Sequence, residues 1–209
     1  MKWRSARPII MLIIALLAAA TLADLAIAGP FEDGLAAAQS GNYGTALRLW
    51  RPLADRGDAD AQYNLGVMYN NGDGVRQDYA EALKWHRQAA AQGNGNAQFN
   101  LGLMYDQGRG MLPDYGEAAR WYRLAADQGV AVAQYRLGLM YHDGQGVTRD
   151  YVQAYMWFSL AVAQFPNSDN EDRQDAIEAR DLVGSKMSQI EIAKARNLAL
   201  RWRIRSNQY

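Results

Sequence analysis

The fold is decided by the stretch AQYNLGVMYNNGDGVRQDYAEALKWHRQAAAQG, residues 61–93, because the chain repeats it. When residues 61–96 are aligned with residues 97–132 without gaps, 19 of 36 positions are identical. A third copy starts in the same register at Ala133, and a degenerate copy precedes the first one. Self-similarity at a fixed period of roughly 20–50 residues is typical of stacked repeat units. The sequence therefore predicts about four units.

Each unit is predicted to contain two antiparallel helices. In the first, expected from Ala61 to about Asn71, the helical period gathers Ala61, Leu65, Met68 and Tyr69 on one apolar face. Gly66 lies beside that face and recurs as Gly102 and Gly138. Glycine costs about 1 kcal/mol of helix propensity relative to alanine, so its return predicts a neighbouring helix that crosses too closely for a Cβ.

The ends of the predicted helices carry recognisable signals. Gly72-Asp73-Gly74 suits a left-handed turn after the first helix, and Asp78 with Glu81 is a capping-box variant that starts the second. The second helix then buries apolar and aromatic residues at i, i+3, i+4 and i+7, namely Ala82, Trp85, His86 and Ala89. A helix pair this short cannot bury its own stripe. The sequence therefore predicts an all-α chain, an α-solenoid of stacked antiparallel helix pairs.

The C-terminal residues predict a cap for this solenoid. Pro166 forbids continuation of the preceding helix, and the acidic stretch 169–175 starts another that runs to about Val183 or Ser185. Ser188 and Glu191 form a second capping box. The helix that follows carries an apolar stripe of Ile192, Ala195, Leu198, Ala199 and Trp202. Because a terminal unit must cover an exposed hydrophobic face, we interpret 169–209 as a C-terminal capping helix pair.

The N-terminal segment has the pattern of an export signal. Basic residues at 2, 4 and 7 precede an uncharged run from Ile9 to Ala23, and Ala26-Ile27-Ala28 matches a signal-peptidase site. An uncleaved anchor is the alternative, but Asp24 interrupts the run before the about 20 apolar residues that a spanning helix needs. The expected location is periplasmic or secreted, with membrane contact only through an uncleaved signal segment. The expected organisation is a signal peptide at 1–28, a degenerate first repeat at 29–60, repeats at 61–96, 97–132 and 133–168, and capping helices at 169–209.

Composition argues against several classes of function. The 22 basic residues balance 22 acidic ones, so the chain lacks the basic excess that nucleic-acid binding requires. It has no cysteine, which excludes disulfides and thiolate sites, and its two distant histidines cannot form a zinc site without several carboxylate ligands. We therefore expect no metal, no cofactor and no nucleic-acid partner.

The run A-x-x-x-L-G-x-M-Y-x-x-G-x-G-V-x-x-D-Y-x-x-A-x-x-W-x-x-x-A-A-x-x-G, residues 61–93, resembles the Sel-1-like repeat, a relative of the tetratricopeptide repeat. The resemblance covers about residues 31–168. It implies an α-solenoid that acts as an adaptor between proteins and is often exported in bacteria. It also implies an alternative, since a cysteine-rich branch binds and slowly hydrolyses β-lactams. The helix pairs of that branch are held by disulfides, which this chain cannot form.

The candidate binding residues lie opposite the core of the first helices. Stacking places them side by side as an aromatic, an aliphatic and a polar row, and the resemblance implies that the first helices line a concave groove. Apolar surface of this kind typically marks a partner site. The alternative is that part of the aromatic row packs between adjacent repeats. The aromatic row consists of Tyr63, Phe99 and Tyr135. The aliphatic row consists of Val67, Leu103 and Leu139, and the polar row consists of Asn70, Asp106 and His142.

Other chemistry-bearing residues have simpler interpretations. Asp78 and Glu81 recur at each helix start and are better explained as caps than as acid and base of a hydrolase. His86 shares its repeat position with Trp50, Tyr122 and Phe158, which indicates a packed ring rather than a ligand.

Two functions remain after these assignments. The first is a scaffold that binds a protein or peptide partner without catalysis. The second is an amide hydrolase acting on β-lactams or muropeptides. The second lacks support in the sequence, because no serine has a histidine close by in the chain.

Overall fold

The structure is a computed structural model that describes residues 29–166 and 171–206. All regular elements in these two ranges are α-helices, which confirms the predicted all-α class. Their bounds are α2 Pro30–Gln39, α3 Tyr43–Asp55, α4 Ala59–Asn71, α5 Tyr79–Ala91, α6 Gly95–Gln107, α7 Tyr115–Asp127, α8 Ala131–Asp143, α9 Tyr151–Gln164, α10 Glu171–Gly184 and α11 Gln189–Ser206. The predicted signal peptide, 1–28, lies outside the described residues.

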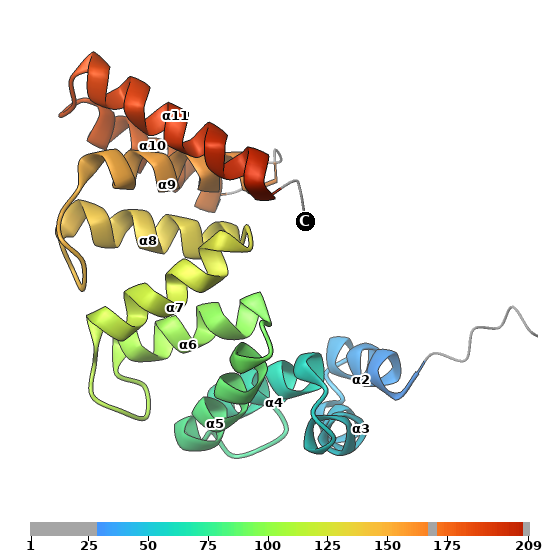
Figure 1. Cartoon of the computed structure of the whole chain (residues 1–209). Coiled ribbons are helices and arrows are strands. Elements are labelled where there is room, and N and C mark those ends of the chain that lie inside the picture. Colours follow the sequence, from blue (N-terminus) through green and yellow to red (C-terminus); the bar gives the residue numbers. More distant parts are fainter. Residues whose placement is uncertain (1–28, 167–170, 207–209) are drawn as a thin grey trace, which may run out of the picture.

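The helices pack in adjacent antiparallel pairs, α2 with α3, α4 with α5, α6 with α7 and α8 with α9. Each second helix then packs against the first helix of the following pair. Figure 1 shows the pairs following one another from α2 and α3 at one end of the molecule to α10 and α11 at the other. The arrangement is the predicted solenoid, whose core is the continuous layer between successive helices.

The helix ends follow from local chemistry. Asp58 and Asn94 cap α4 and α6 by accepting from the backbone N–H of Ala61 and Ala97, at 2.8 Å in both cases. The first helices therefore begin two residues before the predicted start at Ala61, because the cap precedes the apolar pattern. α4, α6 and α8 each end on a glycine in the left-handed region, such as Gly72 with φ 86°.

α5, α7 and α9 start at an aspartate, as predicted, but the capping box at Asp78 is incomplete. The Asp78 carboxylate accepts from the N–H groups of Ala80 and Glu81 at 2.9 and 3.1 Å. The reciprocal bond is missing, because the Asp78 N–H donates to the Tyr69 carbonyl at 2.9 Å and Glu81 pairs with Lys84. Asp78 thus both starts α5 and ties it to the end of α4.

The recurring mid-helix glycine faces a ring rather than a helix backbone. A Cβ added at Gly102 would lie 2.6 Å from Cδ1 of Tyr122, a fully buried side chain on the second helix of the same pair. Gly66 faces His86 and Gly138 faces Phe158 in the same way. The expected close helix crossing is therefore corrected to a close approach between the first helix and an aromatic ring.

The degenerate first pair contains the same contact in a shifted position. A Cβ on Gly34 in α2 would clash with the indole of Trp50 in α3. The connection between α2 and α3 spans only 40–42, whereas the connection between α4 and α5 spans 72–78. The shorter loop explains why Gly34 does not align with Gly66 at the 36-residue period.

A ladder of buried glutamines joins successive units. The Gln62 amide donates to the Ala54 carbonyl at 3.0 Å, and Gln98 donates to the Ala90 carbonyl at 3.2 Å. Gln128 in turn donates to the Gln98 side chain at 2.7 Å. These bonds satisfy carbonyl groups near the ends of the second helices, where helices have no partners of their own. The ladder was not predicted from the sequence.

The glycine loops also hold neighbouring units together. The second glycine of each loop lies on the residue that starts the second helix of the preceding unit: a Cβ on Gly74 would lie 2.5 Å from Cβ of Tyr43, and one on Gly110 would lie 3.0 Å from Cβ of Tyr79. Both glycines have positive φ, at 68° and 76°. Glycine is therefore required at these positions for two reasons: the backbone has a positive φ, and the neighbouring residue leaves no room for a Cβ.

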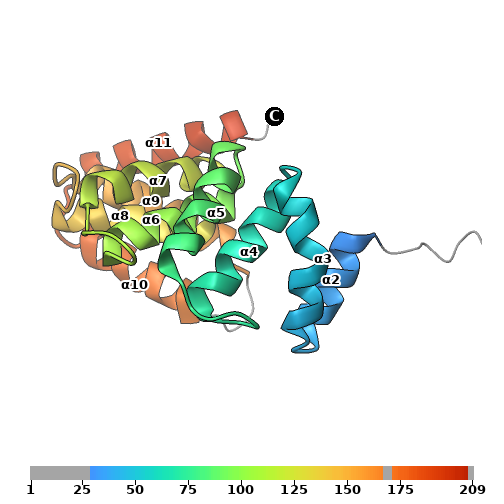
Figure 2. The same cartoon turned by 90° about the horizontal axis from the view of Figure 1, so that it is seen from below.

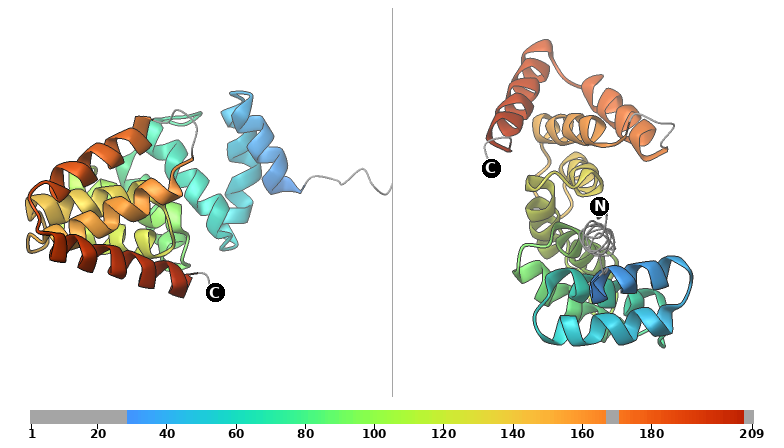
Figure 3. Two further views of the ribbon diagram at one scale, coloured as in Figure 1. Left: turned by 90° about the horizontal axis from the view of Figure 1, so that it is seen from above. Right: turned by 90° about the vertical axis from the view of Figure 1, so that its right-hand side faces the viewer.

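The cap places α9 between two helices. Both α10 and α11 pack against α9, and Figure 2 shows them on opposite sides of it. In the right-hand view of Figure 3 the two helices meet above α9 and separate on either side of it. The predicted capping box starts α11, since the Ser188 N–H donates to Glu191 at 2.8 Å and the Glu191 N–H donates to the Ser188 hydroxyl at 3.3 Å.

His86 makes the stability of the solenoid depend on pH. It is 1% exposed, and burial lowers its pKa from 6.5 to about 4. The unfolded chain binds a proton at a higher pH than the folded chain, so acid favours unfolding. We expect the free energy of unfolding to fall by about 3 kcal/mol from this group alone as the pH drops from 6.5 to 4.

The matched variant is His86→Phe, which has a precedent in Phe158 at the same position of a later unit. Denaturant unfolding at pH 7, 5.5 and 4 should show a smaller acid-induced loss for the variant than for the wild type. Parallel pH profiles for the two proteins would show that His86 does not titrate in this way.

Candidate functional site

The nine predicted binding residues all lie on the first helices α4, α6 and α8, and every one of them is half-buried. Equivalent residues recur on successive helices, so the structure brings each row together along the stack. The aromatic, aliphatic and polar rows are here called the first-helix face. Their role in binding stays a prediction.

The aromatic row packs against the rings that face the mid-helix glycines. Tyr63 lies 5.9 Å from His86, Phe99 lies 5.7 Å from Tyr122, and Tyr135 lies 5.7 Å from Phe158, measured between ring centroids. Tilted ring pairs at these distances are favourable. The aromatic row therefore forms a second layer of rings, packed against the rings that face the mid-helix glycines.

The same rings also border core clusters that extend into the neighbouring unit. The cluster beside Phe99 includes Tyr122 of its own unit and Ala133 of α8, and the cluster beside Tyr63 includes Ala89 of its own unit and Ala97 of α6. This placement is compatible with the alternative in which part of the row packs between repeats. Since each ring keeps part of its surface exposed, packing and partner contact are compatible at this row.

The aliphatic row differs along its length. Leu103 borders the core cluster of α7, α8 and α9, and Leu139 borders the cluster that α9 forms with α10 and α11. Val67 borders none of the described clusters. Of the three residues in the aliphatic row, Val67 is therefore the one with the least contact with the core clusters.

The polar row is tied into local contacts. The Asn70 side chain accepts from Arg109 of the next loop at 3.3 Å. Asp106 accepts from the Tyr122 hydroxyl at 3.1 Å, and burial together with this carboxylate raises the pKa of Tyr122. Asn70 and Asp106 therefore position neighbouring groups within the protein.

His142 closes the polar row at the cap. Its Nδ1 lies 2.7 Å from Asp143, its Nε2 lies 3.3 Å from the Lys186 ammonium, and its ring stacks on Tyr151 with centroids 5.7 Å apart. Lys186 belongs to the turn between α10 and α11. The sequence predicted a polar position here but not its contact with the cap.

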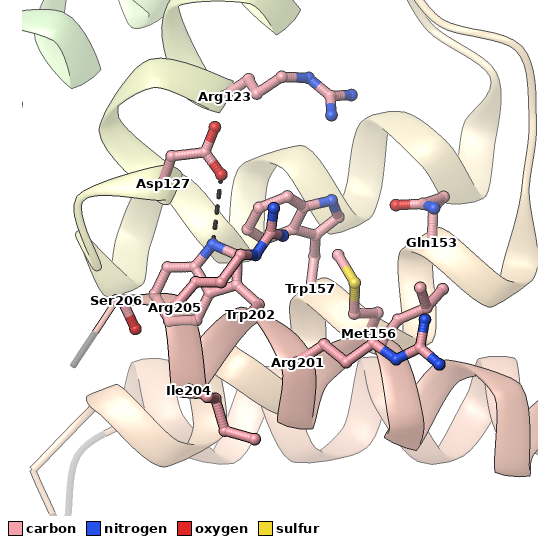
Figure 4. A pocket seen from close by; sticks show the side chains of 11 residues that line it. Arg123, Asp127, Gln153, Met156, Trp157, Arg201, Trp202, Ile204, Arg205 and Ser206 are labelled. Carbon is pink, nitrogen blue, oxygen red and sulfur yellow. Dashed lines mark hydrogen bonds between the residues drawn. The ribbon is translucent and has the colours of Figure 1, made fainter. Parts of the chain in front are cut away.

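A hollow of about 1000 Å³ lies between α7, α9 and α11 (Figure 4). Trp157 and Trp202 meet edge to face at its base, 6.3 Å apart, and the Trp202 indole N–H donates to Asp127 at 3.2 Å. Arg123, Arg201 and Arg205 also line it. This combination of apolar rings and guanidinium groups suits an apolar group that carries negative charge.

The sequence contained one signal for this hollow. Lys84 and Arg120 lie beside Trp85 and Trp121 in the earlier units, with their charged groups 5.0 and 4.8 Å from the ring centroids. The corresponding residue beside Trp157 is Met156. The position that holds Lys84 and Arg120 in the earlier units thus holds the apolar Met156 in the last unit, where α11 packs against α9.

The comparisons with known proteins agree with this architecture. The Sel1 repeat family matches residues 59–94, 95–130 and 131–164, which together form slightly more than half of the chain. The chain belongs to the Sel1 repeat family. No curated protein sequence matches it significantly.

Two solved Sel1 structures resemble this protein over most of its length. One is a Sel1 repeat protein from Oxalobacter formigenes, with 28% identity and a TM-score of 0.70 over 87% of this chain and 68% of the other. Another is a protective antigen of uropathogenic Escherichia coli strains with an SLR fold, with 30% identity and a TM-score of 0.54. That match covers 83% of this chain but 44% of the antigen.

The described residues of this Sel1 protein give the hydrolase alternative no support. The hydroxyl groups of Ser40, Ser159, Ser185 and Ser206 donate to backbone carbonyls of their own helices, and Ser188 is engaged in the cap of α11. No serine within 29–166 or 171–206 forms a hydrogen bond with a histidine. Nucleophile activation needs a base within reach of the hydroxyl.

The same two ranges contain neither a metal-binding cluster nor a membrane-spanning helix. No group of three or more histidine, cysteine, aspartate or glutamate side chains there is arranged to hold a metal ion. Within the same part of the chain, no helix has the length and apolarity needed to span a bilayer.

Proposed function

We propose that this Sel1 repeat protein is a non-catalytic scaffold that binds a protein or peptide partner along the first-helix face. Sel1 repeats usually mediate protein interactions. The observation that carries the proposal for this chain is the recurrence of partly exposed aromatic, aliphatic and polar residues on three successive helices. Aromatic and aliphatic anchors beside polar groups are the composition of interface centres.

The role of each row follows from its contacts. The aromatic ring edges and the aliphatic row supply apolar area at positions fixed by the core beneath them, so little side-chain entropy is lost on binding. The polar row discriminates between partners, because an unpaired polar group opposite Asn70 or Asp106 is costly to bury. An extended or helical segment that crosses several units would contact all three rows.

The test compares Leu103→Lys on this face with Leu124→Lys on α7. Leu124 is 41% exposed, more than the half-buried Leu103, and lies on the second helix of the same unit, so it controls for the addition of a lysine away from the first-helix face. Affinity capture from periplasmic extract with the wild-type protein identifies the partner, and its affinity is then measured for each variant. We expect Leu103→Lys to weaken binding at least tenfold, about 1.4 kcal/mol, and Leu124→Lys to change it less than twofold.

Thermal unfolding of both variants accompanies the binding measurement. Equal binding by the two variants would contradict the proposal for the first-helix face. A large drop in melting temperature with unchanged binding for Leu103→Lys would assign this row to packing alone.

We further propose that the protein is exported and acts in the periplasm or outside the cell. The support is the signal pattern of residues 1–28 together with the start of α2 at Pro30, so that cleavage after Ala28 removes no described helix. N-terminal sequencing of the protein recovered from the producing cells should begin at Gly29. A membrane-embedded product that keeps Met1 would contradict export with cleavage.

A further inference from the structure

The last helix has two apolar faces. One face packs against α9 and the core through residues such as Ala195, Ala199 and Trp202. A turn of 100° per residue places a second set of residues about 180° away, on the side that faces solvent. This second set, here called the α11 outer stripe, consists of Ile190, Ala193, Asn197, Leu200 and Ile204.

The outer stripe is exposed, although it contains large apolar side chains. Ile190 is 83% exposed, Leu200 is 56% exposed and Ile204 is 52% exposed. In Figure 1, α11 lies at the end of the stack, and none of the other described helices covers its outer side. Terminal units of solenoids normally present a polar outer face, so exposed isoleucine and leucine there need another explanation.

The spacing of the stripe is that of a coiled-coil seam. Its members follow one another at intervals of three, four, three and four residues, with Ile190, Asn197 and Ile204 at heptad position a and with Ala193 and Leu200 at position d. The five residues span about 80° of the helix surface, which is narrow enough to be covered by one further helix.

Basic residues flank the stripe on both sides. Lys194 and Arg201 occupy the e positions, and Arg196 and Arg203 occupy g positions. All four are exposed, and Glu191, the one acid of α11, is engaged in the cap. Among the described residues, the side chains of Arg201 and Arg203 form no hydrogen bond or ion pair, whereas Lys194 lies near Glu191, whose pKa is lowered by its bonds with Ser188 and by this lysine. The charges at the edges of the seam are therefore available to an incoming helix.

These features together identify the kind of partner. We propose that the α11 outer stripe docks an amphipathic helix of a protein partner whose edges are acidic. A second copy of α11 would bring basic e and g residues face to face, which disfavours self-association. A bilayer surface requires a broad face rich in large apolar residues, whereas the middle of this stripe is Ala193 and Asn197.

The probe is a fluorescein-labelled synthetic helix of about three heptads with leucine at a and d, one asparagine at the central a position and glutamate at e and g. Its own glutamates repel one another, which keeps it from pairing with itself. The control peptide carries lysine at e and g. By fluorescence anisotropy with the full mature chain, we expect the acidic peptide to bind at least tenfold more tightly than the basic one.

The matched variants are Leu200→Ser and Leu182→Ser. Leu182 lies on α10 and is 55% exposed, against 56% for Leu200, so both changes remove a similar exposed leucine. We expect Leu200→Ser to weaken binding of the acidic peptide about tenfold and Leu182→Ser to leave it unchanged. Equal binding of the two peptides, or equal losses in the two variants, would overturn the proposal.

Further measurements separate this stripe from other surfaces. Leu200-dependent binding to vesicles of phosphatidylglycerol and phosphatidylcholine, without peptide binding, would overturn the proposal in favour of a membrane surface. A dimer that dissociates on Leu200→Ser would overturn it in favour of a second copy. Leu103→Lys should leave acidic-peptide binding unchanged, because the first-helix face is a separate site, so the two proposals can fail independently.

Discussion

The contact between a glycine of the first helix and a ring of the second is the constraint on which the rest of the structure depends. It occurs in each of the repeat pairs formed by α2 to α9, with Trp50, His86, Tyr122 and Phe158 as the rings. The ring occupies the volume that any larger side chain at the glycine would need, and this sets how closely the two helices approach. The aromatic row of the first-helix face then rests on these rings.

A different set of contacts joins each helix pair to the next and makes the stack one continuous structure. The glutamine ladder satisfies buried carbonyl groups between units, and each glycine loop lies on the preceding unit. The ladder ends at Gln134, whose amide donates to the Ala126 carbonyl at 3.1 Å. Its side-chain oxygen is buried without a hydrogen-bond partner among the described residues, and α10 and α11 cover α9 instead. The cap leaves the first-helix face and the α11 outer stripe as separate surfaces, which suits a protein that connects partners.

Much of the fold could be predicted because its signals are local or periodic. Gly72 as a left-handed helix end, Asp78 as a cap and the Ser188–Glu191 box depend on neighbouring residues alone, and all three are present in the structure. The atoms that face Gly102 could not be predicted, because a helical glycine indicates a close approach without saying what approaches. The glutamine ladder could not be predicted either, because the sequence does not show whether a glutamine side chain is buried or exposed. The position of α11 across α9, and with it the hollow at Trp202, depends on contacts between distant segments.

The most direct measurement of the central claim is a double-mutant cycle of Gly102→Ala and Tyr122→Leu, followed by denaturant unfolding. Alanine is the better helix former, yet its Cβ would lie 2.6 Å from the buried Tyr122 ring, so the single variant should be destabilised by about 1–3 kcal/mol. When the ring is replaced by leucine, much of that loss should disappear, giving a coupling free energy of about 1 kcal/mol or more between the two positions. Losses that add to within about 0.3–0.5 kcal/mol would contradict the claim that the ring over the glycine sets the geometry of the pair.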